Sequence, residues 1–269
     1  MKKKAHEEPM SGQDKNGVSR KNPNNITINQ HIIPKKHLTY WSSDGRNVVV
    51  KNSSTEKELT IPFDNPLFCV KRLWDQGVEL DFKKIEDEYQ SQLESVLNGG
   101  IKAKFNMNYF VDYYKSIVIR CELSKKERPH YVVGADLIGE HTKEQLEKSE
   151  WKLVDNETGI FTIPIAESAE SQSASRFVVR ISIDMIFSQL DELFANTNWN
   201  ILFLEENHES LFISDAIFNF HENGFHLLPL TPKILLISEE TKIKMGNALK
   251  SSEINKLMMK FSNIYCIKC

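Results

Sequence analysis

The sequence contains no apolar run that approaches the roughly 20 residues needed to cross a bilayer. The opening Met1-Lys2-Lys3-Lys4 is basic, but no apolar segment follows it, so the pattern of a secretory signal peptide is missing. We therefore expect a cytoplasmic protein that is neither exported nor embedded in a membrane.

Cysteine is scarce, with four in 269 residues. Cys266 and Cys269 form a CxxC pair. Cys69 and Cys121 are isolated in the sequence, so the second half of a four-ligand zinc site is missing. This usage indicates free thiols in a reducing cytoplasm.

Several catalytic signatures are also missing from the sequence. It has no Gly-rich phosphate loop, no Gly-x-Ser-x-Gly elbow and no dinucleotide fingerprint, so ATP use and serine hydrolysis have no support. His-x-x-x-His and His-Glu-x-x-His spacings do not occur either. A neutral histidine can act as a base or a metal ligand near pH 7, but a lone histidine near a turn is usually only hydrogen-bonded. The histidines to weigh in this way are His31, His208, His221 and His226.

Charge is distributed unevenly along the chain. Residues 1–37 carry eight Lys/Arg and three Asp/Glu, a net of +5, which leaves −8 for the rest of a chain with a formal net charge of −3. A polar, basic segment cannot bury enough apolar surface to offset its conformational entropy, so we expect residues 1–27 to form a disordered basic leader. A nucleic-acid-binding arm is the functional alternative, but the segment lacks the interleaved aromatic residues on which bases stack.

Short apolar runs bounded by Asn, Gly and Pro fill the stretch from Trp199 to Ile237. Runs of four or five residues with such boundaries are typical of strands rather than helices. The sequence also predicts a hairpin from 47–51 and 59–62, and strands at 159–164 and 264–267. The runs in the central stretch are 201–204, 211–213, 217–220, 227–230 and 233–237.

Four-residue spacing of apolar side chains predicts the helices. It is clearest over 81–98, before Gly99-Gly100. Further helices are predicted at 106–123, 143–151, 181–194 and 251–261, with a short helix or turn from Pro34 to Trp41 and a polar linker over 167–175. The change of period indicates one α+β domain over residues 28–269, in which amphipathic helices cover a mixed or antiparallel sheet built from 200–237 and 264–268.

Four short motifs resemble those of a known family. They are the segment from Asn29 to Pro34, the step Phe212-Ile213-Ser214-Asp215, the segment from Leu228 to Lys233, and Ile254-Asn255 before the last strand. With these motifs the chain resembles the bacterial domain-of-unknown-function family 4238 over nearly all of 29–267. Ile32 replaces the family's aromatic residue, and Ala216-Ile217 replace its Asn-Pro. The resemblance implies a fold and a bacterial origin, and no mechanism.

Asp215 is the leading candidate for chemistry. A carboxylate at the end of a buried strand is unfavourable unless it is hydrogen-bonded, paired or bound to a metal. Glu240-Thr241-Lys242 follows the strand over 233–237. An Asp followed by Glu-x-Lys is the arrangement with which restriction-type nucleases hold a divalent metal and stabilise the attacking hydroxide. The structural alternative is that Asp215 caps a turn.

Two functional hypotheses follow. The first is a nucleic-acid-directed effector, a metal-dependent nuclease (a hydrolase) of the toxin or phage-defence type. In that enzyme Asp215 and Glu240 bind a divalent metal such as Mg²⁺, while Lys242, Lys233 and His31 are the other catalytic candidates. The second is a non-catalytic module that binds a ligand or a partner protein, in which His31 and Asp215 are structural. The acidic body counts against the nuclease, because nucleic-acid affinity comes largely from phosphate neutralisation.

The two strands near Asp215 and Lys233 are joined by a short connection around Asn223-Gly224. Strands joined in this way are usually neighbours. A buried aspartate also needs a donor, and a lysine or an imidazole is a suitable one. We therefore predict that Asp215, Lys233 and His31 approach one another.

Overall fold

The computed structural model describes residue 27 and residues 29–71, 73–125, 169–205, 208–215, 217, 221, 223–246, 249–262 and 264–269, together with short strands at 12–13, 19–20, 132–134, 152–155 and 160–162. Contacts between Cα atoms divide the chain into two compact units. Unit 1 comprises residues 1–30, 71–79 and 126–182, and unit 2 comprises residues 31–70, 80–125 and 183–269. The single domain expected over residues 28–269 stays a prediction.

One sheet of unit 2 has three antiparallel strands, in the order β10 (Trp199–Phe203), β13 (Ile234–Ser238) and β12 (Leu227–Thr231). Every residue of β12 and β13 is buried. Burial on both faces explains why these strands appear in the sequence as continuous apolar runs. β12 is an edge strand, where Pro229 is tolerated although it has no N–H to donate.

The other sheet of unit 2 has four antiparallel strands, in the order β11 (Ile213–Ser214), β14 (Tyr265–Lys268), β4 (Asn47–Asn52) and β5 (Glu58–Pro62). With the helices, these sheets confirm the α+β class and the predicted β4–β5 hairpin. The prediction that 200–237 and 264–268 build one sheet is wrong, because β14 pairs with β4 and β11. Apolar patterning identifies a strand but not its partner, which hydrogen bonds between distant segments decide.

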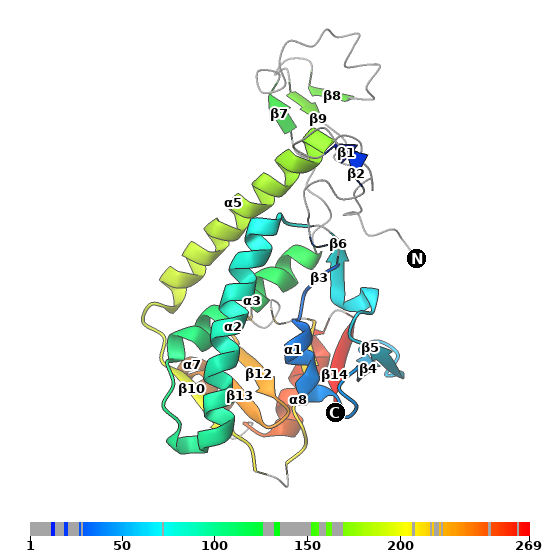
Figure 1. Cartoon of the computed structure of the whole chain (residues 1–269). Helices are drawn as coiled ribbons and strands as arrows, with labels where there is room; N and C mark the ends of the chain where they lie inside the picture. Colours follow the sequence, from blue (N-terminus) through cyan, green and yellow to red (C-terminus); the bar gives the residue numbers. More distant parts are fainter. Residues whose placement is uncertain are drawn as a thin grey trace. The chain divides into compact units, whose positions relative to one another are not determined.

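Helices pack on these sheets where the four-residue spacing predicts them. The rings of Tyr114 in α3 and Trp199 in β10 have centroids 5.1 Å apart, so α3 packs against the three-stranded sheet (Figure 1). No described helix has both the length and the apolar character that a membrane span requires. The helices within the described residues are α1 (Lys35–Leu38), η1 (Thr39–Trp41), η2 (Pro66–Phe68), α2 (Gln76–Gly99), η3 (Gly100–Lys102), α3 (Met107–Lys125), α5 (Ala169–Phe194), α7 (Glu239–Met245) and α8 (Ser251–Phe261).

The predicted linker over 167–175 is a second correction, because α5 already begins at Ala169. The stretch is polar, but it holds Ala, Glu, Gln and Ser and neither Gly nor Pro, so no residue in it interrupts a helix. The predicted strand over 159–164 is present as β9 (Ile160–Thr162). The helix predicted over 143–151 lies outside the described residues.

Unit 1 contains a pair of antiparallel strands, β1 (Gly12–Gln13) and β2 (Ser19–Arg20), and an antiparallel sheet of β7 (Val132–Gly134), β9 and β8 (Lys152–Asp155). The side-chain amide of Gln30 anchors the segment just before α2. Its Oε1 accepts hydrogen bonds from the N–H groups of Leu73 and Trp74, at 2.6 and 3.1 Å. Two short strands elsewhere are β3 (Asn29–His31) and β6 (Cys69–Lys71). The predicted leader, residues 1–27, lies outside the described residues except for β1, β2 and Thr27.

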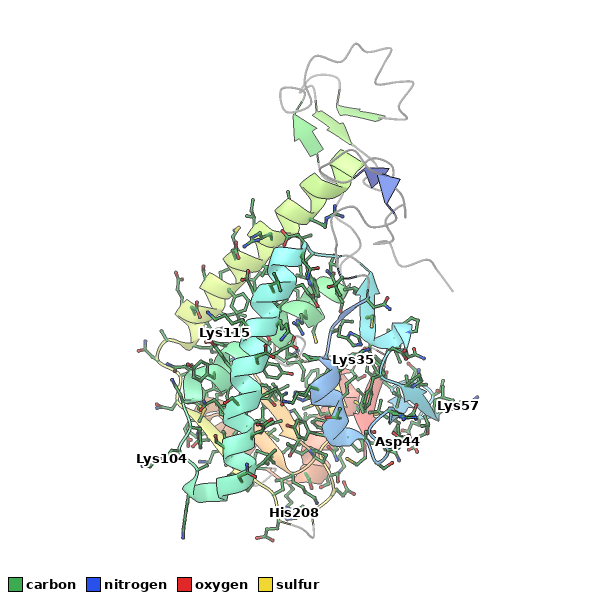
Figure 2. The ribbon with its side chains drawn as sticks, viewed as in Figure 1. Lys35, Asp44, Lys57, Lys104, Lys115 and His208 are labelled. Atoms are coloured by element: carbon green, nitrogen blue, oxygen red, sulfur yellow. The ribbon has the colours of Figure 1, made fainter. Side chains whose placement is uncertain are left out.

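A fully buried histidine, His37, joins three elements of unit 2. Its Nε2–H donates to the carbonyl of Pro229 in β12 at 3.0 Å, and its Nδ1 accepts from the Tyr113 hydroxyl of α3 at 2.8 Å. The carbonyl requires a proton on Nε2, and burial lowers the pKa of the ring to about 3, so at pH 7 the ring is neutral and Nδ1 is the acceptor. The ring also stacks on Trp41, with centroids 5.2 Å apart. Tyr89 of α2 stacks on the same ring, with centroids 6.2 Å apart. Figure 2 shows the described side chains on the ribbon.

The buried imidazole predicts an acid-dependent loss of stability. Burial lowers the pKa of His37 from 6.5 to about 3, so the unfolded chain binds a proton that the folded chain does not. The free energy of unfolding should therefore fall as the pH drops from 6.5 towards 3, by about 1.4 kcal/mol per pH unit from this group. Urea unfolding at pH 7, 6, 5 and 4 measures the slope, and His37→Gln should reduce it. Equal slopes for the two proteins would contradict the prediction.

Candidate functional site

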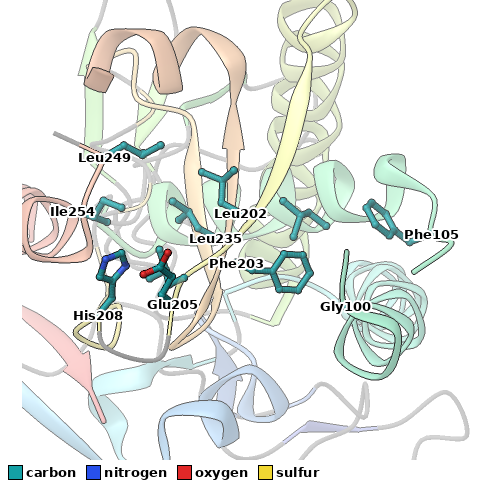
Figure 3. A pocket seen from close by; sticks show the side chains of 11 residues that line it. Gly100, Phe105, Leu202, Phe203, Glu205, His208, Leu235, Leu249 and Ile254 are labelled. Carbon is teal, nitrogen blue, oxygen red and sulfur yellow. The ribbon is translucent and has the colours of Figure 1, made fainter. Parts of the chain in front are cut away.

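A largely apolar cavity of about 500 Å³ opens beside strand β10 in unit 2 (Figure 3). We call it the β10 cavity. Its walls come from β10, the turn after it, β13, α8 and the segment around η3. The lining residues are Gly100, Phe105, Ile201, Leu202, Phe203, Leu204, Glu205, His208, Leu235, Leu249 and Ile254. Segments far apart in the sequence therefore build one concave site of the size typical for small ligands.

The turn that follows β10 is held by hydrogen bonds to its own residues and to the start of β13. The N–H of Leu204 donates to the carbonyl of Lys233 at 2.8 Å. The Lys233 ammonium donates to the carbonyl of His208 at 2.5 Å, and the N–H of His208 donates to the carbonyl of Glu205 at 3.1 Å. These bonds fix the position of Glu205 and His208 at the mouth of the cavity.

Glu205 and His208 place polar groups at one end of the otherwise apolar cavity (Figure 3). Glu205 is exposed, whereas Nδ1 of His208 is buried and has no hydrogen-bond partner within the described part of the chain. Buried polar atoms in folded proteins are nearly always hydrogen-bonded. A carboxylate and an imidazole at this point suit a ligand group that donates hydrogen bonds or carries positive charge.

A second cavity in unit 2, of about 590 Å³, brings together two of the histidines that the sequence singles out. The rings of His221 and His226 have centroids 5.3 Å apart. Burial, followed by the neighbouring His221, lowers the pKa of His226 from 6.5 to about 4, against an opposing effect of Glu240. His226 is therefore neutral at pH 7.

Asp215 lies directly after β11, as the sequence predicts, and is buried. Its Oδ1 accepts a hydrogen bond from the Ser262 hydroxyl at 3.1 Å, and its Oδ2 accepts one from the N–H of Ile264 at 3.0 Å. Both carboxylate oxygens of Asp215 therefore bind the connection between α8 and β14. This geometry is that of the structural alternative, in which the aspartate caps a turn.

The other nuclease candidates lie on α7 and in the turn before β13. Glu240 is in the first turn of α7, where the helix dipole favours a carboxylate. Lys242, one turn later, forms an ion pair with Glu239 at 3.3 Å. Lys233 holds the turn of the β10 cavity, as described above. Each of the two lysines therefore has a structural role in this fold.

His31 lies close to a backbone carbonyl and a thiol. Its Nε2 is 3.1 Å from the carbonyl oxygen of Phe63 and 3.5 Å from the sulfur of Cys69. The strands near Asp215 and Lys233 belong to different sheets, so their prediction as neighbours is wrong: a short connection does not oblige two strands to pair. The approach of Asp215, Lys233 and His31 stays a prediction.

No group of three or more His, Cys, Asp or Glu side chains within the described ranges has an arrangement that could hold a metal ion. The Mg²⁺ site of Asp215 and Glu240 stays a prediction. Cys266 is buried, while Cys269 is exposed. Side chains three positions apart on a strand point to opposite faces, so this spacing does not by itself converge on one ion.

No protein-family model, curated protein or solved structure matches the chain. The resemblance to the domain-of-unknown-function family 4238, and the bacterial origin it implies, therefore stay predictions.

Of the residues that line the β10 cavity, the sequence singles out His208 alone, as one of four histidines near turns. Phe105, Leu249 and Ile254 have the same apolar character as core residues, and they come together only in the tertiary structure. Glu205, a carboxylate directly after the apolar run 201–204, is a further signal in the sequence. It is of the same kind as the signal that drew attention to Asp215.

The capping role of Asp215 predicts a loss of stability on its removal. Asp215→Ala leaves the Ser262 hydroxyl and the Ile264 N–H without their acceptor, which should lower the free energy of unfolding by about 1–3 kcal/mol. Asp64→Ala, at an exposed position, is the matched control and should change it by less than about 0.5 kcal/mol. Urea unfolding at pH 7 measures both. An unchanged or raised stability of Asp215→Ala would contradict the capping role.

Proposed function

We propose that this chain is a cytoplasmic, non-catalytic binding module that takes a small, largely apolar molecule into the β10 cavity. The ligand places a hydrogen-bond-donating or cationic group against Glu205 and His208. Apolar walls supply affinity through burial of ligand surface, and the two polar side chains orient the ligand.

The observation that carries this proposal is an apolar cavity of about 500 Å³ with its polar groups gathered at one end. Phe203 in its wall is 37% exposed. A large aromatic side chain left partly in water beside a concave apolar surface is a common feature of binding sites. A ligand would cover this ring and supply a partner for Nδ1 of His208.

The nuclease hypothesis receives less support from the same structure. Asp215 uses both carboxylate oxygens to hold the chain before β14, whereas a metal ligand needs an oxygen directed at an ion. Lys233 and Lys242 have structural partners of their own. For these reasons we favour the binding module.

Filling the cavity tests the proposal. Leu249→Trp adds bulk to the wall of the β10 cavity, whereas Ile243→Trp makes the same kind of change on α7 at a side chain that is 72% exposed and does not line the cavity. We expect a neutral apolar dye such as Nile red to bind the wild type and Ile243→Trp alike, and Leu249→Trp about tenfold more weakly. Fluorescence titration measures the affinities. Equal binding by all three proteins would refute the cavity as the site.

The charge at the mouth of the cavity predicts which ligands compete. Decylamine should displace the dye at a concentration about tenfold lower than decanoate, because Glu205 attracts the ammonium and repels the carboxylate. Glu205→Gln should remove most of this difference while leaving dye binding unchanged. A preference for decanoate in the wild type would contradict the proposed ligand class.

The nuclease hypothesis has its own discriminating variant. Asp215→Ala is unsuitable, because loss of the turn cap would itself reduce activity. Glu240→Gln, at an exposed position in the first turn of α7, removes the second metal ligand with little expected change in stability. Expression toxicity in a bacterial host and Mg²⁺-dependent cleavage of DNA and RNA are the measurements. Equal harmlessness of wild type and Glu240→Gln, without cleavage, is the result expected for a binding module.

A further inference from the structure

Strand β10 is an edge strand, because β13 is its one neighbour within the described part of the chain. The N–H of Leu204, directly after β10, donates to the carbonyl of Lys233 at 2.8 Å. The backbone groups that face a given neighbour alternate along an antiparallel strand. The even-numbered residues of β10 therefore face β13. Ile201 and Phe203 direct their N–H and C=O groups to the open side of the sheet.

The β10 cavity extends along this open side. Side chains of a strand alternate between the two faces of its sheet, and the cavity is lined from both faces. Leu202 and its cross-strand partner Leu235 lie on one face, and Ile201 and Phe203 lie on the other. Figure 3 shows the first pair on the side of Ile254 and Phe203 on the side of η3. A cavity reaches both faces of a sheet by passing its edge, so the open backbone groups of β10 lie in the site.

The two edges of this three-stranded sheet differ. At the β12 edge, Pro229 has no N–H to offer, and its carbonyl is bound by His37 at 3.0 Å. Proline and charged side chains are the usual protection of an exposed edge against pairing with another strand. β10 contains neither, and Phe203 at its end is 37% exposed. The β10 edge is therefore open to an added strand.

The polar end of the cavity determines the direction of such a strand. An antiparallel strand places its N-terminus at the C-terminal end of β10, where Glu205 and His208 line the cavity. A free α-ammonium there meets the Glu205 carboxylate and donates to the buried Nδ1 of His208, which has no partner among the described residues. A parallel strand would instead bring its C-terminal carboxylate towards Glu205.

The turn at this end of the cavity is negatively charged. Residues 205–209 contain three Glu and no Lys or Arg. The Lys233 ammonium is bound to a carbonyl of the turn. Lys256 lies near Glu209 and is paired with Glu253 at 2.7 Å. Four carboxylates therefore stand against two ammonium groups, and the balance favours a cationic group of the ligand.

The basic side chains of the opposite wall lie at the other end of the cavity. Lys102 and Lys104 come shortly before Phe105 in the sequence. Figure 3 shows Phe105 at the end away from Glu205 and His208. The cavity therefore has a negative end at the turn after β10.

We propose that the ligand of the β10 cavity is a short apolar peptide with a free N-terminus, which adds to the open edge of β10 as an antiparallel strand. Its first residue lies opposite Phe203 and its third opposite Ile201, and these pairs exchange backbone hydrogen bonds. Main-chain bonds supply affinity in this mode of binding, and apolar walls accept alternate side chains. This inference rests on the proposed function and names its ligand class.

N-methylated peptides test the pairing on the full-length chain. The parent is a tetrapeptide amide of alternating Leu and Val with a free N-terminus, and calorimetric titration measures its affinity. A methyl group on the nitrogen of the third residue removes the donor to the carbonyl of Ile201 and should weaken binding at least about tenfold. A methyl group on the nitrogen of the second residue, which faces away from β10, is the matched control and should weaken it less than about threefold. Equal effects, or the reverse order, overturn the proposal.

The direction of the peptide has its own test. Acetylation removes the charge of the N-terminus and should weaken binding to the wild type about tenfold, but binding to Glu205→Gln less than about threefold. Equal affinity of the free and acetylated peptides for the wild type overturns the antiparallel arrangement.

The Nile red titration separates failure of this inference from failure of the proposed function. We expect the parent peptide to displace the dye, and to bind Ile243→Trp like the wild type and Leu249→Trp about tenfold more weakly. A dye that binds the wild type and Ile243→Trp but not Leu249→Trp, without displacement by the peptide, overturns the peptide alone. A dye that binds all three proteins alike refutes the cavity itself. Self-association in sedimentation that the peptide abolishes would assign the β10 edge to a second copy, which also overturns the proposal.

Discussion

The hydrogen-bonded imidazole of His37 is the contact on which the core of unit 2 depends. It links α1 to the edge strand β12 through Pro229 and to α3 through Tyr113. Burial of a polar ring without hydrogen-bond partners would be costly, and these two bonds satisfy both of its nitrogens. Pro229 has no N–H to donate to a neighbouring strand. Its carbonyl, although buried, is satisfied by the His37 side chain.

Both cavities lie on the framework that this contact organises. β12 pairs with β13, β13 pairs with β10, and β10 carries the wall of the first cavity. α3, which carries Tyr113, supplies Val118 to the wall of the second cavity. The two sites also differ in chemistry. The β10 cavity is largely apolar with one carboxylate and one imidazole at its mouth, which suits a small molecule, whereas the second cavity has the two histidines His221 and His226 in its wall.

Asp215 and Lys233 show that residues singled out by a catalytic pattern can also hold the backbone of the fold. Asp215 does follow a strand and is buried, but its partners are the hydroxyl of Ser262 and an N–H of the next loop. Lys233 binds the carbonyl of His208 and so supports the turn of the β10 cavity. A short catalytic pattern such as Asp followed by Glu-x-Lys records residue types, and the same types satisfy the backbone of tight turns.

The sequence by itself determined the type and approximate bounds of most described elements, because the periods of helices and strands are local properties of the chain. It also determined the β4–β5 hairpin, whose strands are close in sequence. The polar start of α5 was missed, since polarity alone does not stop a helix. Only the tertiary structure decided that β14 pairs with β4 and β11, and that Phe105, Leu235 and Ile254 line one cavity. Strand partners and cavity walls depend on contacts between segments far apart in the chain, and these leave no periodic trace in the sequence.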